Sequence, residues 1–137
     1  MATTRDVSDE HAAVDALASR FFAAIERADL AEIEAIYSPD VAVWVNVTQQ
    51  TSGLAANLRL LRGFTARLRD LHYDVEERTF FPGGFTQRHV VTGKLASGEA
   101  VAVPVALFVR VADGRITHIH EYLDSRDRKS TRLNSSH

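Results

Sequence analysis

His89 and Glu121 are the two residues whose types and spacing suit acid–base chemistry. They lie in a β-rich segment that is divided by two turn signals, Ser97-Gly98 and Asp113-Gly114. Because glycine tolerates the positive φ that tight hairpins require, a two-residue turn is expected at each place. Counting outward from these turns pairs His89 with Ala106 and Ala106 with Glu121. The register therefore predicts a row of three side chains on one face of a sheet.

A carboxylate and an imidazole in such a row could share a water or a ligand. Glu121 and His89 would lie about 9–10 Å apart, since neighbouring strands are separated by roughly 4.8 Å. Apolar neighbours would desolvate Glu121 and favour its protonated form, which suits a general acid or base. Gln87 faces the same way as His89 and could donate to a carbonyl oxygen. Two alternatives stay open: a slip of one residue would turn Glu121 to solvent, and His89 could be a rim histidine without a chemical role.

A second histidine pair, His118 and His120, occupies the opposite face of the last predicted strand. A metal site normally needs three or more protein ligands, and no third ligand is evident there, so no metal is expected. The predicted register also places five aliphatic residues on this convex face, and a face this apolar is expected to be covered. We therefore predict a homodimer through the convex face of the sheet, around Val101, Val103, Val105, Leu107 and Val109.

Three helices are expected to position the sheet. Apolar residues recur at spacings of three and four from His11 to Arg27 and include Phe21. Asp29 is the expected cap of a short second helix, which ends at Ser38-Pro39-Asp40. A longer third helix is expected over residues 54–71, where leucines and a phenylalanine recur at helical spacing.

The remaining segments predict strands. Residues 41–47 and 73–81 are rich in β-branched and aromatic residues, and the hairpin segment adds three more strands. The expected order is helix, helix, strand, helix and then four antiparallel strands. Segregated helices followed by a continuous meander indicate an α+β roll, a curved antiparallel sheet packed against three helices.

Composition limits the class of protein. The chain has 137 residues, 45% of them hydrophobic and 25% charged, with a net charge of −2. These values indicate a single globular domain, and the balanced charge gives no basic surface for nucleic acid. No apolar run is long enough to span a membrane. The polar N-terminus lacks the apolar core of a secretory signal and there is no cysteine, so a cytoplasmic location is expected.

The domain is expected to cover residues 8–126. Residues 1–8 are predicted to be a frayed leader. The segment 128–137 changes abruptly to polar residues without periodicity and resembles vector-derived read-through, so we predict a disordered, non-native tail.

Three segments together resemble the NTF2-like superfamily, the cystatin-like α+β roll. They are residues 20–30, 36–44 and 109–124, which begin Arg-Phe-Phe, Ile-Tyr-Ser-Pro-Asp and Val-Arg-Val. The resemblance is closest to the SnoaL-like and ketosteroid-isomerase-like branch and spans about residues 10–125. It implies a deep, cone-shaped pocket between the helices and the concave face of the sheet, and it implies no cofactor.

The resemblance also suggests pocket residues and a chemistry. Ketosteroid isomerases use an aspartate base and a tyrosine with a protonated aspartate. The comparable positions here are Val45, Phe21 and Ala106, so steroid isomerisation is not expected. Glu121 matches the acidic residue that SnoaL-type cyclases place on the last strand, and Tyr37 matches a pocket tyrosine. The implied substrate-binding set is Phe21, Tyr37, Val45, Gln87, Ala106, Phe108, Ile119 and Leu123.

Two functions follow as expectations. In the first, Glu121 assisted by His89 catalyses an isomerase-, cyclase- or lyase-type reaction on a small hydrophobic molecule that carries a carbonyl group. In the second, the same fold is a non-catalytic ligand-binding domain or a dimeric interaction domain, because this superfamily hosts many functions.

Overall fold

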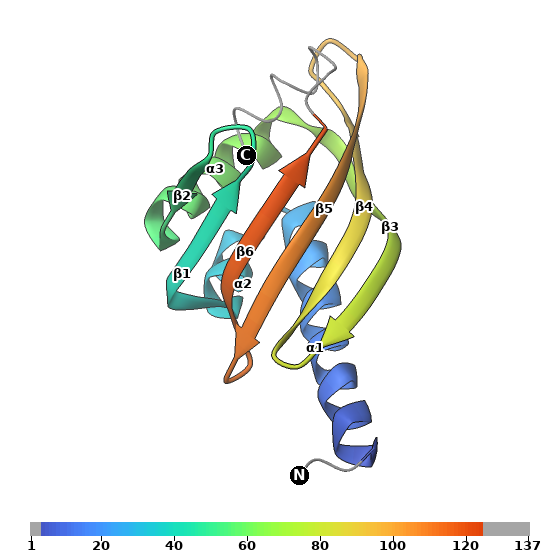
Figure 1. Ribbon diagram of the computed structural model, residues 1–137. Coiled ribbons are helices and arrows are strands. Elements are labelled where there is room, and N and C mark those ends of the chain that lie inside the picture. The colour runs from blue at the N-terminus through green and yellow to red at the C-terminus, as the bar shows by residue number, and fades with distance from the viewer. Residues whose placement is uncertain (1–3, 125–137) are drawn as a thin grey trace.

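The structure is a computed structural model that describes residues 4–124 (Figure 1). The predictions for the segment 128–137 fall outside the described residues. The elements follow one another as α1 (Thr4–Glu26), α2 (Leu30–Ile36), β1 (Tyr37–Val45), β2 (Gln50–Ser52), α3 (Leu54–Arg67), β3 (Arg69–Phe81), β4 (Gly84–Lys94), β5 (Ala100–Ala112) and β6 (Arg115–Leu123).

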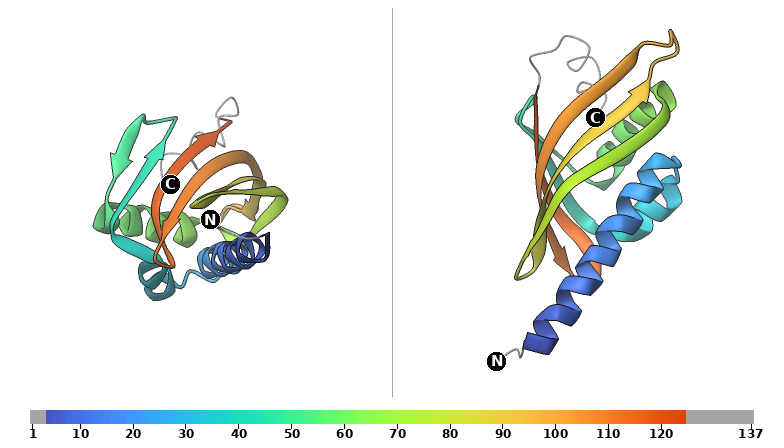
Figure 2. Two further views of the ribbon diagram at one scale, coloured as in Figure 1. Left: turned by 60° about the horizontal axis from the view of Figure 1, so that its bottom comes forward. Right: turned by 90° about the vertical axis from the view of Figure 1, so that its right-hand side faces the viewer.

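The strands form one curved sheet in the order β2-β1-β6-β5-β4-β3. All neighbouring strands are antiparallel except β1 and β6, which run parallel, so the sheet is mixed. The helices lie on the concave side of the sheet, and its other side, here called the outer face, carries none of the helices of residues 4–124 (Figure 2). The predicted α+β roll with three helices is confirmed. The expectation of a wholly antiparallel sheet is corrected, because β1 runs parallel to β6.

The helices differ from the predictions mainly at their ends. Helix α1 already begins at Thr4, where a leader was expected, because no glycine or proline interrupts residues 4–26. Asp29 caps α2 as expected, and its carboxylate accepts the backbone N–H of Glu32 at 3.1 Å. Helix α3 ends at Arg67 because Leu68 adopts extended backbone and leads directly into β3. None of the helices within residues 4–124 is long and apolar enough to cross a membrane.

The hairpin between β4 and β5 differs from its predicted register by one residue. Its loop has three residues, Ala96 to Gly98, and is closed by a hydrogen bond from the N–H of Leu95 to the carbonyl of Glu99 at 2.9 Å. Gly98 takes the positive φ, 89°, that ends such a loop. As a result Ala106 faces Arg88 across the hairpin instead of His89.

The hairpin between β5 and β6 slips in the opposite sense. Its two-residue turn is as predicted, with positive φ at Asp113 (53°) and Gly114 (72°). A register shift after Arg110 then adds one residue to β6, so Glu121 faces Leu107 instead of Ala106. Each slip of one residue exchanges the two faces once, so two slips leave His89 and Glu121 on the same face, whereas β5 presents its other set of side chains to that face.

The changed register of β5 also alters which residues lie on the convex face. The aliphatic residues that were expected on the convex face point into the core: Val101, Val103, Val105, Leu107 and Val109 are all buried. They pack with buried residues of α1, α2, α3 and β1 in one hydrophobic core. The prediction of a valine-rich outer face is therefore wrong.

Candidate functional site

A small cavity lies between the helices and the concave face of the sheet. Its volume is about 20 Å³. A space of this size accommodates one water-sized group, so the deep pocket implied by the family resemblance is filled by side chains here. The wall is mostly apolar and consists of Phe21, Phe22, Ile25, Tyr37, Val43, Asn57, Leu61, Tyr73, His89, Leu107, Ile119 and Glu121.

Glu121 and His89 both lie on this wall. Their side chains are almost fully buried, with 4% of Glu121 and 1% of His89 exposed. Glu121 on β6 shares a row with Leu107 and Gln87, and His89 lies in the adjacent inward row of β4. The two groups are thus diagonal neighbours across β5. They face the same side of the sheet, as predicted, but they do not lie in one row.

His89 belongs to a buried hydrogen-bond chain. The Gln87 amide nitrogen lies 2.9 Å from Nδ1 of His89, and Nε of Arg78 donates to Oε1 of Gln87 at 2.7 Å. Arg78 itself donates to the carboxylate of Asp15 at 2.7 Å and to the hydroxyl of Ser19 at 3.0 Å. The chain therefore connects helix α1, strand β3 and strand β4 to the cavity.

A β-bulge brings Arg78 to the inner face. The register of β3 against β4 shifts between Val75 and Glu77, so Glu76 is the additional residue. Before the bulge, Tyr73 points inward; after it, Arg78 pairs with Gln87 on the same face. Without the additional residue the arginine would point outward, because side chains alternate along a strand.

Arg78 is also held by apolar contacts. Its side chain is only 12% exposed, and its guanidinium lies over the rings of Phe22 and Phe85 at 6.0 and 5.8 Å. A guanidinium that is desolvated over aromatic faces, hydrogen-bonded and ion-paired has little freedom to turn. The chain to His89 thus starts from a fixed donor.

Two tyrosines complete the polar part of the cavity. The hydroxyl of Tyr37 donates to Oδ1 of Asn57 at 2.6 Å. Burial raises the pKa of Tyr37, and the nearby charge of Glu121 raises it further. Burial and then Glu121 also raise the pKa of Tyr73, whose ring lies 5.0 Å from that of His89. Both phenols therefore stay protonated beside the carboxylate.

The structure divides the predicted substrate-binding residues into three groups. Phe21, Tyr37 and Ile119 line the cavity. Val45, Gln87 and Leu123 are buried in the core around it. Ala106 and Phe108 are corrected: the changed register turns them to the outer face, where Phe108 is 51% exposed.

Asn57, Tyr73 and Arg78 contribute to the site but were missed from the sequence. Asn57 could have been found, because it lies four residues before the buried Leu61 on the apolar side of its helix. An asparagine at a core position of a helix needs a partner, which indicates a buried polar contact. No comparable signal marks Arg78, since its inward direction depends on the bulge.

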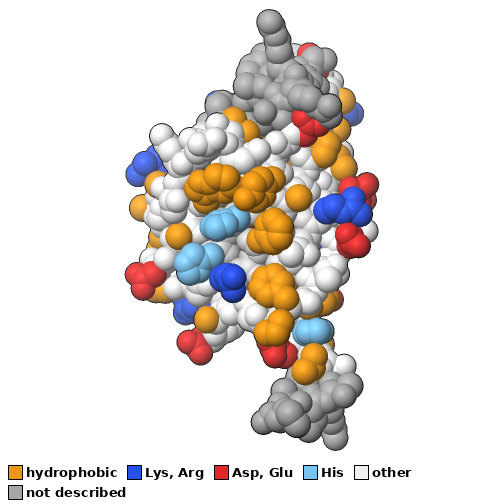
Figure 3. All heavy atoms as spheres, in the orientation of Figure 1, with side chains coloured by type: hydrophobic (Ala, Val, Ile, Leu, Met, Phe, Trp, Pro, Cys, Tyr) orange, Lys and Arg blue, Asp and Glu red, His pale blue; other side chains and the backbone are white. Residues whose placement is uncertain are grey.

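The outer face carries aromatic residues in place of the expected valines. The ring of Tyr122 lies 5.3 Å from that of Trp44 and 6.0 Å from that of Phe108, and His120 packs on Trp44 at 5.7 Å. Hydrophobic side chains gather beside two histidines over the middle of this face (Figure 3). Within residues 4–124, no three histidine, cysteine or acidic side chains are placed to hold a metal ion.

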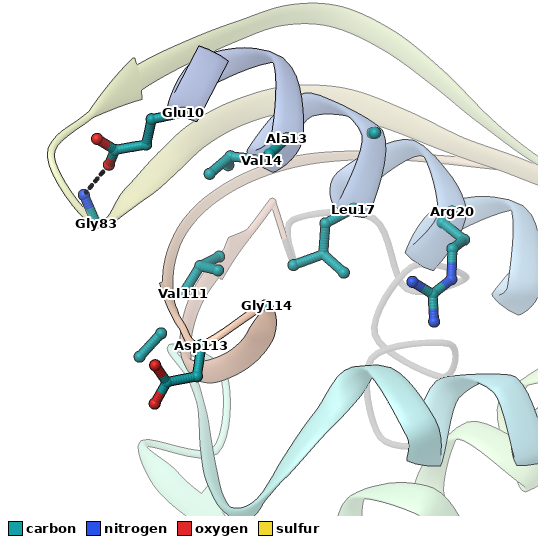
Figure 4. A pocket seen from close by; sticks show the side chains of 11 residues that line it. Glu10, Ala13, Val14, Leu17, Arg20, Gly83, Val111, Asp113 and Gly114 are labelled. Carbon is teal, nitrogen blue, oxygen red and sulfur yellow. Dashed lines mark hydrogen bonds between the residues drawn. The ribbon is translucent and has the colours of Figure 1, made fainter. Parts of the chain in front are cut away.

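A second, more open hollow of about 570 Å³ lies beside α1 (Figure 4). One wall is α1 and the other is formed by the turns at Gly83 and Gly114. Two of its charged groups are engaged: Glu10 accepts the backbone N–H of Gly83 at 3.3 Å, and Arg20 is paired with Glu32 at 3.1 Å. The hollow is roomier than the buried cavity, but it does not contain the acid–base pair.

Comparison with known proteins agrees with this architecture. The sequence model of the SnoaL-like domain matches residues 18–119. No curated protein sequence matches the chain.

Solved structures with the same fold differ in described function. AclR from Streptomyces galilaeus, a candidate hydroxylase, is 22% identical with a TM-score of 0.77, over 90% of this chain and 85% of that one. An LEH-like epoxide hydrolase from M. tuberculosis is 20% identical with a TM-score of 0.72, over 89% and 90%. An NTF2-like protein of unknown function from Burkholderia pseudomallei is 15% identical with a TM-score of 0.73, over 88% and 96%. At these identities the similarity shows the fold alone.

Proposed function

Because the chain belongs to the SnoaL-like domain family, we propose that it binds a small apolar molecule carrying a carbonyl group and acts on it by acid–base chemistry. One observation carries the proposal: Glu121 and His89 are both buried and both line one apolar cavity. Titratable groups that line a cavity together are candidates for a functional site.

Glu121 and His89 suit the two requirements of enolisation, which are a base for the α-proton and a donor for the carbonyl oxygen. The Glu121 carboxylate takes a proton from the carbon next to the carbonyl, so that the C–H bond breaks and its electron pair moves toward the carbonyl oxygen. An N–H of His89 donates to that oxygen and stabilises its developing negative charge. Return of the proton to a different carbon gives isomerisation, and attack by the enolate carbon gives ring closure.

Binding requires the cavity to enlarge. Its present volume of about 20 Å³ holds only a water-sized group, and its wall is made of side chains such as Phe21 and Leu107. A substrate therefore displaces lining side chains as it enters. This requirement favours a small, compact ligand over a large polycyclic one.

Proton exchange tests this function without knowledge of the natural substrate. Cyclopentanone is incubated with the protein in heavy water, and NMR follows the loss of the α-proton signals. We expect exchange faster than in buffer and a concentration dependence that saturates. Saturable binding without faster exchange would favour the non-catalytic ligand-binding alternative. If the protein neither binds cyclopentanone nor speeds its exchange, both the catalytic proposal and the ligand-binding alternative are contradicted.

We also infer that the chain forms a homodimer through the outer face of the sheet. Phe108 and Tyr122 are 51% and 43% exposed there, and Trp44 packs against Tyr122. Clustered exposed aromatic side chains are typical of protein interfaces. The proposed interface thus keeps the predicted face but consists of different residues.

A further inference from the structure

We propose that Arg78 is a positioning residue that holds His89 as a neutral imidazole with its proton on Nε2. It acts through Gln87, whose amide orientation it fixes. The inference rests on the proposed function and deepens it, because it gives the reason for the two proposed roles: His89 donates a hydrogen bond and Glu121 is left as the base.

The first step is the orientation of the Gln87 amide. A guanidinium can only donate hydrogen bonds, so the amide atom 2.7 Å from Nε of Arg78 is the oxygen. Turning the amide over would set its NH₂ group against the Arg78 donor. A buried donor that faces another donor loses its hydrogen bond and stays desolvated, which disfavours the turned amide.

The second step is the state of His89. With its oxygen engaged by Arg78, Gln87 directs its NH₂ group at Nδ1 of His89, 2.9 Å away. Because an amide NH₂ only donates, Nδ1 accepts and carries no proton. A neutral imidazole then has its proton on Nε2, which is buried on the other side of the ring.

The third step is the anchoring of Arg78. Its Nη1 donates to Asp15 and Ser19 on α1, and its guanidinium lies between aromatic side chains. The bulge at Glu76 directs it inward. The donor at the head of the chain is therefore fixed by three elements, and Gln87 has one favourable orientation.

The consequence is that His89 and Glu121 have different roles in the cavity. A histidine whose Nδ1 is occupied and whose Nε2 is protonated cannot accept a proton without breaking its bond to Gln87. It can donate a hydrogen bond to a carbonyl oxygen. Glu121 is then the group that removes the proton, as neutral histidines and carboxylates divide the work in other enzymes.

Nitrogen NMR of protein labelled in its histidine rings tests the inference. The two ring nitrogens have distinct chemical shifts when protonated and when not. At neutral pH we expect an unprotonated Nδ1 and a protonated Nε2 for His89, assigned by the signals that disappear in His89→Asn. A wild-type spectrum with the proton on Nδ1 would overturn the proposal, and this result needs no variant to fold.

Two variants separate positioning from simple packing. Gln87→Glu has nearly the same shape and still accepts from Arg78, but it offers an oxygen to His89, so we expect a proton on Nδ1. Arg78→Met frees the amide to turn and should give a mixture of His89 tautomers. The matched control is Arg88→Met, which removes an exposed arginine of β4, the strand that carries Gln87 and His89, and should leave the His89 signals unchanged. An Arg78→Met spectrum identical to wild type would contradict the role of Arg78.

The measurement is independent of catalysis. A spectrum with the expected tautomer and no exchange of cyclopentanone would leave this inference standing and contradict the proposed reaction. Exchange that depends on Glu121, together with a His89 proton on Nδ1, would support the proposed reaction and contradict this inference.

Discussion

The hydroxyl of Tyr37 donates a 2.6 Å hydrogen bond to the side chain of Asn57, which joins the start of β1 to α3 across the core. Both residues are buried. Tyr37→Phe leaves the Asn57 oxygen buried without this donor, and we expect the free energy of unfolding to fall by about 1–3 kcal/mol. Urea unfolding measures the change.

A double-mutant cycle isolates this bond. Asn57→Leu removes the acceptor, so adding Tyr37→Phe to it should cost less than Tyr37→Phe alone. Equal effects of Tyr37→Phe in both backgrounds would show that the bond contributes nothing to stability.

Alkaline pH should destabilise the protein through its buried tyrosines. Burial and the charge of Glu121 raise the pKa values of Tyr37 and Tyr73 above the ordinary 10.0. Below pH 10 both phenols are protonated in the folded and unfolded states, so stability is unaffected. Above it the unfolded tyrosines lose protons that the folded ones retain, and each lowers the free energy of unfolding by about 1.4 kcal/mol per pH unit.

Single phenylalanine variants test the origin of this pH dependence. Tyr37→Phe and Tyr73→Phe should each flatten the decline in unfolding free energy above pH 10. Urea unfolding at a series of alkaline pH values provides the slopes. A slope that stays the same in both variants would mean that other groups cause the alkaline unfolding.

The proposed dimer depends on aromatic residues of the outer face. Phe108→Glu places a charge in that interface. We expect the dissociation constant of the dimer to rise about thirtyfold or more, since an interface hot spot contributes about 2 kcal/mol. Sedimentation equilibrium gives the dissociation constant. Val75→Glu alters an exposed apolar residue outside the aromatic cluster and serves as the control. A wild-type protein that is monomeric at all concentrations would disprove this dimer.

The sequence predicted the architecture well because helical spacing and turn signals are local. It could not settle the register of β5, because a glycine at Gly98 fits both a two-residue and a three-residue loop. The register shift after Arg110 has no turn signal at all. Together these shifts moved Ala106 and Phe108 to the outer face, although His89 and Glu121 kept the face that was expected.

The polar surroundings of the site were harder to predict than the acid–base pair. Arg78 would point outward by simple alternation, and only the bulge at Glu76 turns it toward Gln87. The cavity volume depends on how side chains such as Phe21 and Leu107 pack, and no local pattern encodes that. The sequence thus indicated which residues could react, and the structure showed what holds them.

The role of Glu121 as the base is tested most directly by proton exchange of cyclopentanone in the Glu121→Gln variant. General acid–base catalysis contributes about 10²–10⁴-fold, so we expect the saturated exchange rate to fall by that factor while the ketone still binds. His118→Gln, which alters an exposed histidine of the outer face, should exchange at the wild-type rate. A folded Glu121→Gln variant that exchanges as fast as wild type would contradict the proposed function.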